Sequence, residues 1–293
     1  MNKKISIKSI VLVAKSEYIR WLVNPKIIIL AVVFLPMRDS VVVPMLRASE
    51  EVGSPINVLE PCISMVNSWM GLLLLALSYM ILIASFPTSE GNMLFYVARM
   101  GRKNWILGEI LFQCISVFTY SLITTIITAA QVFHKSFFSN GWSLVVTEYD
   151  KIYGDLEGGL KMREILPPNL FFQMTPFKSY LLSFGLFSLF LLLCGMLFLT
   201  GCLYQKRLLL FFIQVLHITV GCGMILINNK SMWLFPISHS LLAYHYHKYF
   251  RKYLFSPWLS LGLFGIILLI IGIIIYRRAQ KVSLDLIGGE VLS

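Results

Sequence analysis

The chain has 293 residues, of which 57% are hydrophobic and only 13% are charged, and its formal net charge is +11. Soluble domains carry roughly 25% charged residues, so this composition excludes an ordinary soluble globular fold. Basic loops between apolar segments explain the positive charge through membrane topology, and no nucleic-acid partner is expected.

The first predicted element is a basic amphipathic helix over residues 1–24. Its apolar side chains recur at helical spacing, with basic residues between them. A helix of this kind is expected to lie in the inner membrane interface. Asn24 and Pro25 favour the end of this helix and the start of the next one. The apolar stripe consists of Ile7, Ile10, Val11, Ala14, Tyr18 and Leu22.

Six apolar segments follow, and each is long enough for about 30 Å of hydrocarbon. Because the membrane interior offers no water to backbone groups, each segment is predicted to be an α-helix. The sequence thus predicts a single all-α polytopic membrane domain over residues 1–293. The predicted spans are 25–46, 66–86, 105–133, 180–203, 208–227 and 257–276.

Lysine and arginine are concentrated on one side of this predicted topology. Most of them fall in residues 1–26, 87–104, 204–207 and 277–293. The positive-inside rule therefore predicts that both termini are cytoplasmic, in a bacterial plasma membrane. The opposite side has the segment 134–179, which is too long for a simple connection and is expected to have its own structure.

Arg38 and Asp39 interrupt the first predicted span. They follow Lys26 by about 12 residues, or about 18 Å along an α-helix. If the helix continues to residue 46, the pair lies in the outer half of the bilayer, where charged groups are costly and usually functional. If Pro36 ends the helix, the pair lies at the outer interface without a special role. The first alternative gives the hypothesis that Arg38 or Asp39 lines a transport path.

The segment 87–104 is too short to cross a membrane and is expected on the inner side. Pro87 ends the preceding span, and Gly101 can end a short helix before Trp105 re-enters the interface. One interpretation is an interfacial loop whose basic residues reflect only the positive-inside rule. The other is a surface for docking to another protein, because apolar residues lie beside a basic patch. The apolar residues are Met93, Leu94, Phe95, Tyr96 and Val97, and the basic ones are Arg99, Arg102 and Lys103.

No enzymatic motif is found along the sequence. The phosphate-binding pattern GxxxxGK[ST] is missing, so the chain is not expected to bind ATP by that route. His245 and His247 are two residues apart, which favours an aromatic interfacial belt over a metal site. Glu50 and Glu51 have no Arg or His at a useful spacing, so a catalytic role is disfavoured. Neither enzymatic activity nor a bound cofactor or metal is expected.

The order of these parts resembles the permease subunit of a type-2 ATP-binding-cassette (ABC) exporter of Firmicutes. The resemblance covers the whole chain and rests on the basic N-terminal helix, the Asn-Pro-Lys that opens the first span, and six spans with both ends inside. It also rests on the stretch SFPTSEGNMLFYVARMGRKNWILGEILF at residues 85–112. Many relatives have a short outer connection after the third span, so the segment 134–179 departs from the family pattern.

This resemblance implies an ABC ATPase subunit as partner, which binds ATP and Mg, and a second permease that is identical or different. It implies export of an amphipathic peptide, antibiotic or lipid by alternating access. Residues 1–24 would be the elbow helix, residues 87–104 the loop with the coupling helix, and 233–253 would hold short helices. The implied coupling residues are Glu90, Met93, Leu94, Phe95, Tyr96, Arg99 and Arg102. The alternative is a secondary transporter or another polytopic membrane protein that is not coupled to ATP.

Overall fold

The computed structural model describes residues 4–87, 97–153, 160–247, 250 and 252–281. Nearly all of these residues lie in helices or in the short turns between them. The strands within the described residues are β1 (Ile56–Asn57) and β2 (Ser136–Phe137), which pair in parallel. The chain is therefore built almost entirely from helices.

Five helical segments are long and apolar enough to cross a membrane. They coincide with five of the six predicted spans, which is compatible with a multi-pass membrane protein. The segment Arg102–Lys135 consists of α7 (Arg102–Val132) and a 3-10 turn, η3 (Phe133–Lys135). The other segments are Pro25–Val52, α11 (Pro176–Leu203), α12 (Arg207–Leu226) and α14 (Pro257–Lys281).

The first segment is helical from end to end, although its pitch changes. The N–H of Val43 donates to the carbonyl of Arg38, five residues back, which is the bonding of a π-helical turn. The expectation that Pro36 ends the helix is therefore wrong, and the helix also continues past the predicted end at residue 46. In chain order it consists of η1 (Pro25–Ile27), α2 (Ile28–Met37), the π-helical turn η2 (Arg38–Val42) and α3 (Val43–Val52).

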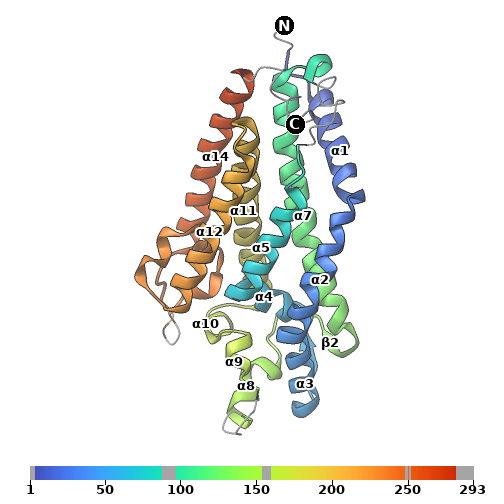
Figure 1. The fold of residues 1–293 in the computed structure, drawn as a ribbon. Helices are drawn as coiled ribbons and strands as arrows, with labels where there is room; N and C mark the ends of the chain where they lie inside the picture. The colour runs from blue at the N-terminus through green and yellow to red at the C-terminus, as the bar shows by residue number, and fades with distance from the viewer. Residues whose placement is uncertain (1–3, 88–96, 154–159, 248–249, 251, 282–293) are drawn as a thin grey trace.

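The predicted N-terminal helix is present as α1 (Ile7–Val23). Figure 1 shows α1 beside the first part of α7, with α2 continuing from its end. Ile7 and Val11 of the predicted apolar stripe are exposed, whereas Val13, Glu17 and Trp21 are buried. Ala14 of the stripe is also buried, and Ile10 and Tyr18 are half-buried. The face of α1 that packs against the bundle therefore overlaps the predicted stripe only in part, and it includes Glu17, which the stripe did not predict.

The second predicted span is shorter than expected and sharply bent. α4 (Glu60–Asn67) and α5 (Trp69–Ile83) meet at an angle of 83°. The hydroxyl of Ser68 accepts a hydrogen bond from the N–H of Gly71 and caps α5. Gly71 is required at this bend, because a Cβ there would lie 2.2 Å from the carbonyl oxygen of Met65.

The buried side chain of Asn67 fixes the direction of α4. Its amide nitrogen donates to the carbonyl of Ile63 and to Oγ of Ser183, both at 2.8 Å. Its amide oxygen accepts from the N–H of Ala243 at 3.0 Å. Since Ser183 belongs to α11 and Ala243 to the connection between α12 and α14, one side chain joins three parts of the fold.

We call the end of the bundle where α1 begins and α14 ends the basic end, and the opposite end the far end. In Figure 1 the basic end is at the top, and the spanning helices run side by side toward the far end. At the far end α3 packs against α8 (Leu144–Ile152), and α8 packs against α9 (Met162–Ile165), which precedes α10 (Pro168–Phe171) in the chain. The connection between α12 and α14 forms η4 (Lys230–Leu234), α13 (Pro236–Ser240) and η5 (Leu242–His245). These are short helices in the region where the resemblance implied them.

Glu60 attaches the long far-end segment to the bundle. One carboxylate oxygen accepts from the N–H of Ser143 at 2.7 Å, and the other accepts from the Ser143 hydroxyl at 2.8 Å and the Asn57 N–H at 3.1 Å. Glu60 is fully buried, and a buried carboxyl group is tolerated when donors surround it in this way. The segment 134–179 is thus held in place by its own helices and by α4.

Polar side chains on α7 form a seam with α5. The hydroxyl of Tyr79 donates to Oε1 of Gln113 at 3.2 Å, and the hydroxyls of Ser78 and Tyr120 are 2.6 Å apart. In a membrane, side-chain hydrogen bonds of this kind hold neighbouring helices together. The buried residues of α7 that bond to α5 are Gln113, Ser116 and Tyr120, whereas Ser121 bonds to Ser188 of α11.

Gly71→Ala should destabilise the protein, because its Cβ overlaps a backbone oxygen that cannot move without opening the bend. Overpacking of this kind costs about 1–3 kcal/mol. We expect a clear fall in the melting temperature of the detergent-purified protein. Gly185→Ala in α11 is the matched control, since nothing lies within 4 Å of its Cβ position. Equal melting temperatures for the two variants would contradict the close approach at Gly71.

Candidate functional site

The candidate site is the connection between α5 and α7 at the basic end, which the sequence pattern marks as a docking segment. The structure describes residues 84–87 and 97–101 of this connection. The site is therefore defined by the two ends of the connection and by the helices that hold them. Five predicted coupling residues lie outside the described residues: Glu90, Met93, Leu94, Phe95 and Tyr96.

The end that follows α5 is held by two basic side chains. Arg207, the first residue of α12, donates to the backbone carbonyls of Ala84 and Phe86. Lys26 in η1 donates through Nζ to Oγ of Ser85 at 2.5 Å. Carbonyl groups after the last turn of a helix lack partners within that helix, and cationic side chains satisfy them well. The first end of the connection is therefore attached to α12 and to the start of the first spanning segment.

The end that precedes α7 is held by the side chain of Asn104. Its amide oxygen accepts from the N–H of Ser6 at 2.9 Å, and its amide nitrogen donates to the carbonyls of Lys4 (3.2 Å) and Met100 (2.8 Å). Residues 97–100 are helical and stop at Gly101, whose φ of 87° favours glycine. Asn104 thus joins the connection to the start of α1.

Arg102 adds a third attachment. Its guanidinium donates to the carbonyl of Gln280 at 3.0 Å, near the end of α14. The same region has its own small apolar core, separate from the core of the bundle, to which α1, α7, α11 and α14 all contribute. The buried members of this core are Val13, Val97, Trp105, Ile106, Met196, Leu199, Leu203, Ile275 and Ala279.

This geometry can transmit a mechanical displacement. Hydrogen bonds and the small core link residues 84–86 and 97–104 to five helices, and packed helices move as rigid elements. Of the predicted coupling residues that are described, Arg99 is exposed and Arg102 is half-buried. An open pocket of about 640 Å³ lies beside Arg207, with Lys206 and apolar residues such as Phe198 and Phe211 along its wall.

Arg38 and Asp39 lie elsewhere, in the π-helical turn η2. Both side chains are exposed on the surface of the single chain. They are therefore separate from the basic end, and they line neither the pocket beside Arg207 nor the pocket beside Glu50. A π-helical turn often marks a functional position in a helix.

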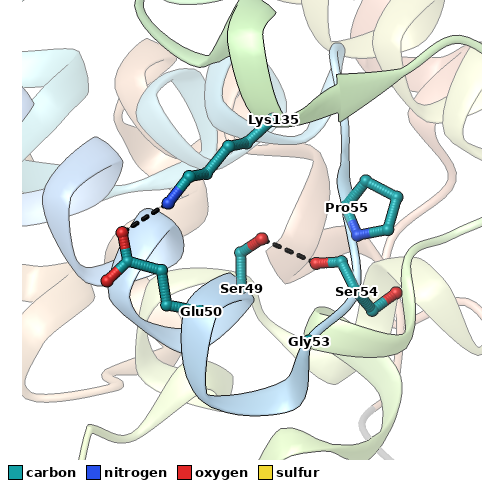
Figure 2. Close-up of a pocket in the computed structure, with 6 residues that line it drawn as sticks. All are labelled: Ser49, Glu50, Gly53, Ser54, Pro55 and Lys135. Carbon is teal, nitrogen blue, oxygen red and sulfur yellow. Dashed lines mark hydrogen bonds and ion pairs between the residues drawn. The ribbon is translucent and has the colours of Figure 1, made fainter.

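Glu50 and Glu51 point to different partners at the far end. Figure 2 shows Glu50 paired with Lys135 beside an open pocket of about 230 Å³, and Ser49 bonded to the carbonyl of Ser54 at 2.6 Å. Glu51 accepts a hydrogen bond from the hydroxyl of Tyr149 at 2.5 Å. Each acid therefore attaches α3 to the segment 134–179, and the two carboxylates do not form an acid–base pair.

The histidines are arranged differently from the sequence interpretation. His245 is buried and is joined to His239 through Oγ of Ser260, whereas His247 lies on the other side of Tyr246. Among the described residues, no three His, Cys, Asp or Glu side chains come together as metal ligands. Sequence reasoning considered the closely spaced pair His245 and His247 and missed the partner in another helix.

Asn104 and Arg207 were also missed as site residues. Both follow a recognisable signal, since each lies within the first three residues of a spanning helix and next to a lysine. Their partners, however, lie about a hundred residues away in sequence. A contact over that separation depends on how the helices pack. A local sequence pattern does not predict this packing.

Comparison of the chain with protein-family models, curated proteins and solved structures finds no match. The fold and the apolar helices define an all-α protein that is compatible with a multi-pass membrane location. Its function is therefore argued from the residues and the geometry described above.

Asn104→Ala should release the start of α1. The N–H of Ser6 and the carbonyls of Lys4 and Met100 lose their partner, and an unsatisfied group of this kind costs about 1–3 kcal/mol. Hydrogen–deuterium exchange of residues 5–10 should accelerate by about tenfold or more. Asn140→Ala at the far end is the control, because Asn140 accepts only from Phe177 among the described contacts. Unchanged exchange at residues 5–10 in Asn104→Ala would show that this side chain does not hold α1.

Proposed function

We propose that the chain is the permease subunit of an ATP-driven ABC exporter. The observation that supports this proposal best is the attachment of both ends of the α5–α7 connection to α1, η1, α12 and α14. A partner that pushes on this connection moves the ends of several spanning helices together. The sequence lacks the GxxxxGK[ST] pattern, so ATP is bound and hydrolysed with Mg in a separate ATPase subunit.

In this proposal the basic end faces the cytoplasm of a bacterium, and the chain lies in the plasma membrane. The concentration of Lys and Arg around that end supports this orientation. Residues 87–104 form the coupling segment, and α1 is the elbow helix beside it. The far end, with the segment 134–179, then faces the outside and contacts substrate on its release.

Leu94→Asp and Phe95→Asp should each abolish co-purification with the cognate ATPase. A charge at an apolar docking position must be desolvated without a partner, which weakens binding by about 2–5 kcal/mol. Co-expression of tagged permease with the ATPase and pull-down from detergent measures this loss.

Phe138→Asp is the matched control for this experiment. Phe138 is an aromatic residue that is 74% exposed at the far end, away from the coupling segment. The control variant should retain the ATPase. Normal assembly and ATP hydrolysis in both coupling variants would reject the assignment of residues 87–104 as the docking segment.

The path for substrate is proposed to lie between two permeases, which are identical or different. Arg38 and Asp39 are exposed on the surface of a spanning segment, where contact with lipid is costly. A water-filled path between two subunits gives these charges a more favourable environment. The large apolar surface of the helices around them suits an amphipathic peptide, antibiotic or lipid.

Arg38→Ala and Asp39→Ala should each reduce export while the protein is still made in normal amounts. The measurement is the tolerance of cells that express the transporter to a panel of amphipathic antimicrobial peptides. Arg47→Ala is the control, because Arg47 is also exposed and lies further along α3. If cells with either η2 variant tolerate the peptides as well as wild-type cells and make the same amount of protein, the two residues do not line the path.

Secondary transport is the second candidate, and Glu109 favours it. Glu109 is 1% exposed in α7, and its Oε2 has no hydrogen-bond partner among the described residues. Buried carboxyl groups in membrane helices often carry protons in ion-coupled transporters. In that case tolerance in the same assay would persist without the ATPase gene and would be lost when the proton gradient is dissipated.

A further inference from the structure

Two buried histidines share one serine hydroxyl at the far end. Nδ1 of His239 and Nε2 of His245 each lie 2.8 Å from Oγ of Ser260. The other ring nitrogen of each histidine faces a backbone carbonyl: that of Trp233 at 2.8 Å for His239, and that of Leu241 at 3.0 Å for His245. The three side chains are at most 3% exposed, so solvent does not complete these hydrogen bonds.

The four contacts need more hydrogens than the neutral side chains possess. A carbonyl oxygen can only accept, so Nε2 of His239 and Nδ1 of His245 must each carry a hydrogen. In a neutral imidazole the second nitrogen then presents a lone pair, and here both lone pairs point at the hydroxyl of Ser260. That hydroxyl has a single hydrogen. Three hydrogens therefore serve four contacts, and one nitrogen faces an oxygen lone pair at 2.8 Å.

We infer that His239, Ser260 and His245 form a binding site for one proton. The incoming proton bonds to the lone pair of one imidazole, and the new N–H donates to Oγ of Ser260. The Ser260 hydroxyl donates to the other imidazole. All four contacts then have a hydrogen, and one of them becomes a stronger, charge-assisted hydrogen bond. Binding of a second proton is disfavoured, because the Ser260 hydrogen would then have no acceptor and two positive charges would lie close together.

The surroundings make this site acid-sensitive. The sequence has no Asp or Glu between Glu164 and Asp285, so η4, α13, η5, α14, α11 and α12 contribute no carboxylate. The acid on neighbouring α4, Glu60, is bonded to Ser143 and Asn57. On the described parts of these elements and their connections, the charged or titratable groups toward the far end are Lys178, Tyr180, His217, Cys222, Lys230, Tyr244, Tyr246, His247, Lys252 and Tyr253. Arg207, Tyr276, Arg277, Arg278 and Lys281 lie in the parts of α12 and α14 at the basic end.

Burial without a counter-charge lowers the pKa of His239 and lowers the pKa of His245 from 6.5 to about 4. A base whose pKa is lowered is neutral at pH 7 and takes up its proton only as the pH falls. The two histidines are therefore expected to be neutral at pH 7 and to bind one shared proton as the pH falls below the ordinary pKa of histidine.

The site lies where the far-end elements meet. η5 is bonded to Asn67 of α4 through Ala243, and Asn169 of α10 donates to the carbonyls of Ala243 and Tyr246. The rings of Trp233, Phe255 and Phe264 surround the two imidazoles. Protonation here changes the bonding of a helix junction and does not require the proposed export function.

Nitrogen NMR of the full-length protein, with ¹⁵N-histidine, in lipid bilayers tests the inference. A protonated ring nitrogen and one with a lone pair give separate signals, and the chain has five histidines. Assignment uses His134→Gln, His217→Gln and His247→Gln, which leave the site intact. At pH 7.5 His239 and His245 should together show two lone-pair nitrogens. Near pH 4 they should show one, because one proton has been bound.

Ser260→Ala removes the acceptor of the new N–H and should lower the proton affinity of the pair by about tenfold or more. Ser238→Ala is the matched control, since Ser238 is buried in the same connection and its hydroxyl has no partner among the described residues. The control should titrate like the wild type. Two lone-pair nitrogens that persist in the wild type at pH 4, or two separate protonations unaffected by Ser260→Ala, would overturn the inference. The wild-type result alone decides the question if Ser260→Ala does not fold.

Discussion

The sharp bend between α4 and α5 is the constraint on which the far half of the structure depends. α4 turns away from the bundle by 83°, and Asn67 satisfies its amide group with α4, α11 and η5 at once. A buried amide is costly unless every donor and acceptor has a partner, so these three elements are fixed relative to one another. Once α4 is fixed, Glu60 at its start determines where the segment 134–179 attaches.

The two ends of the bundle are held together by different chemistry. At the basic end, cationic side chains such as Arg207 and Arg102 donate to carbonyls at helix ends, beside the buried amide of Asn104. At the far end, buried carboxyl, amide, imidazole and hydroxyl groups bond to one another and to the backbone. The first kind of contact uses long, flexible side chains, which can follow a helix that moves. The second kind fixes the far-end elements relative to one another, and in our proposal its bonding changes when the pair His239 and His245 binds a proton.

Much of the helical architecture follows from local composition. The predicted spans 180–203 and 257–276 fall within α11 and α14, and 208–227 matches α12 except for its last residue, because long uninterrupted apolar runs have one stable form in a membrane. Pro36 was a misleading signal, since the π-helical turn η2 lets the helix continue beyond it. The bend after Asn67 was missed because its cause, a hydrogen-bond partner in η5, lies far away in sequence. The candidate docking segment was predicted from its basic residues and from Pro87 and Gly101, which favour helix ends. Asn104 and Arg207, which hold its two ends, were not predicted.

The sequence by itself determined the apolar helices, the concentration of basic residues at one end, and the position of the short amphipathic connection after the second span. These features depend on composition and spacing, which act over one or two helical turns. The tertiary structure alone decided that Glu17 is buried, that Arg38 and Asp39 are exposed, and that His245 pairs with His239. Side-chain partners across helices are selected by packing and by the need to satisfy every buried polar group, and both conditions exist only in the folded chain.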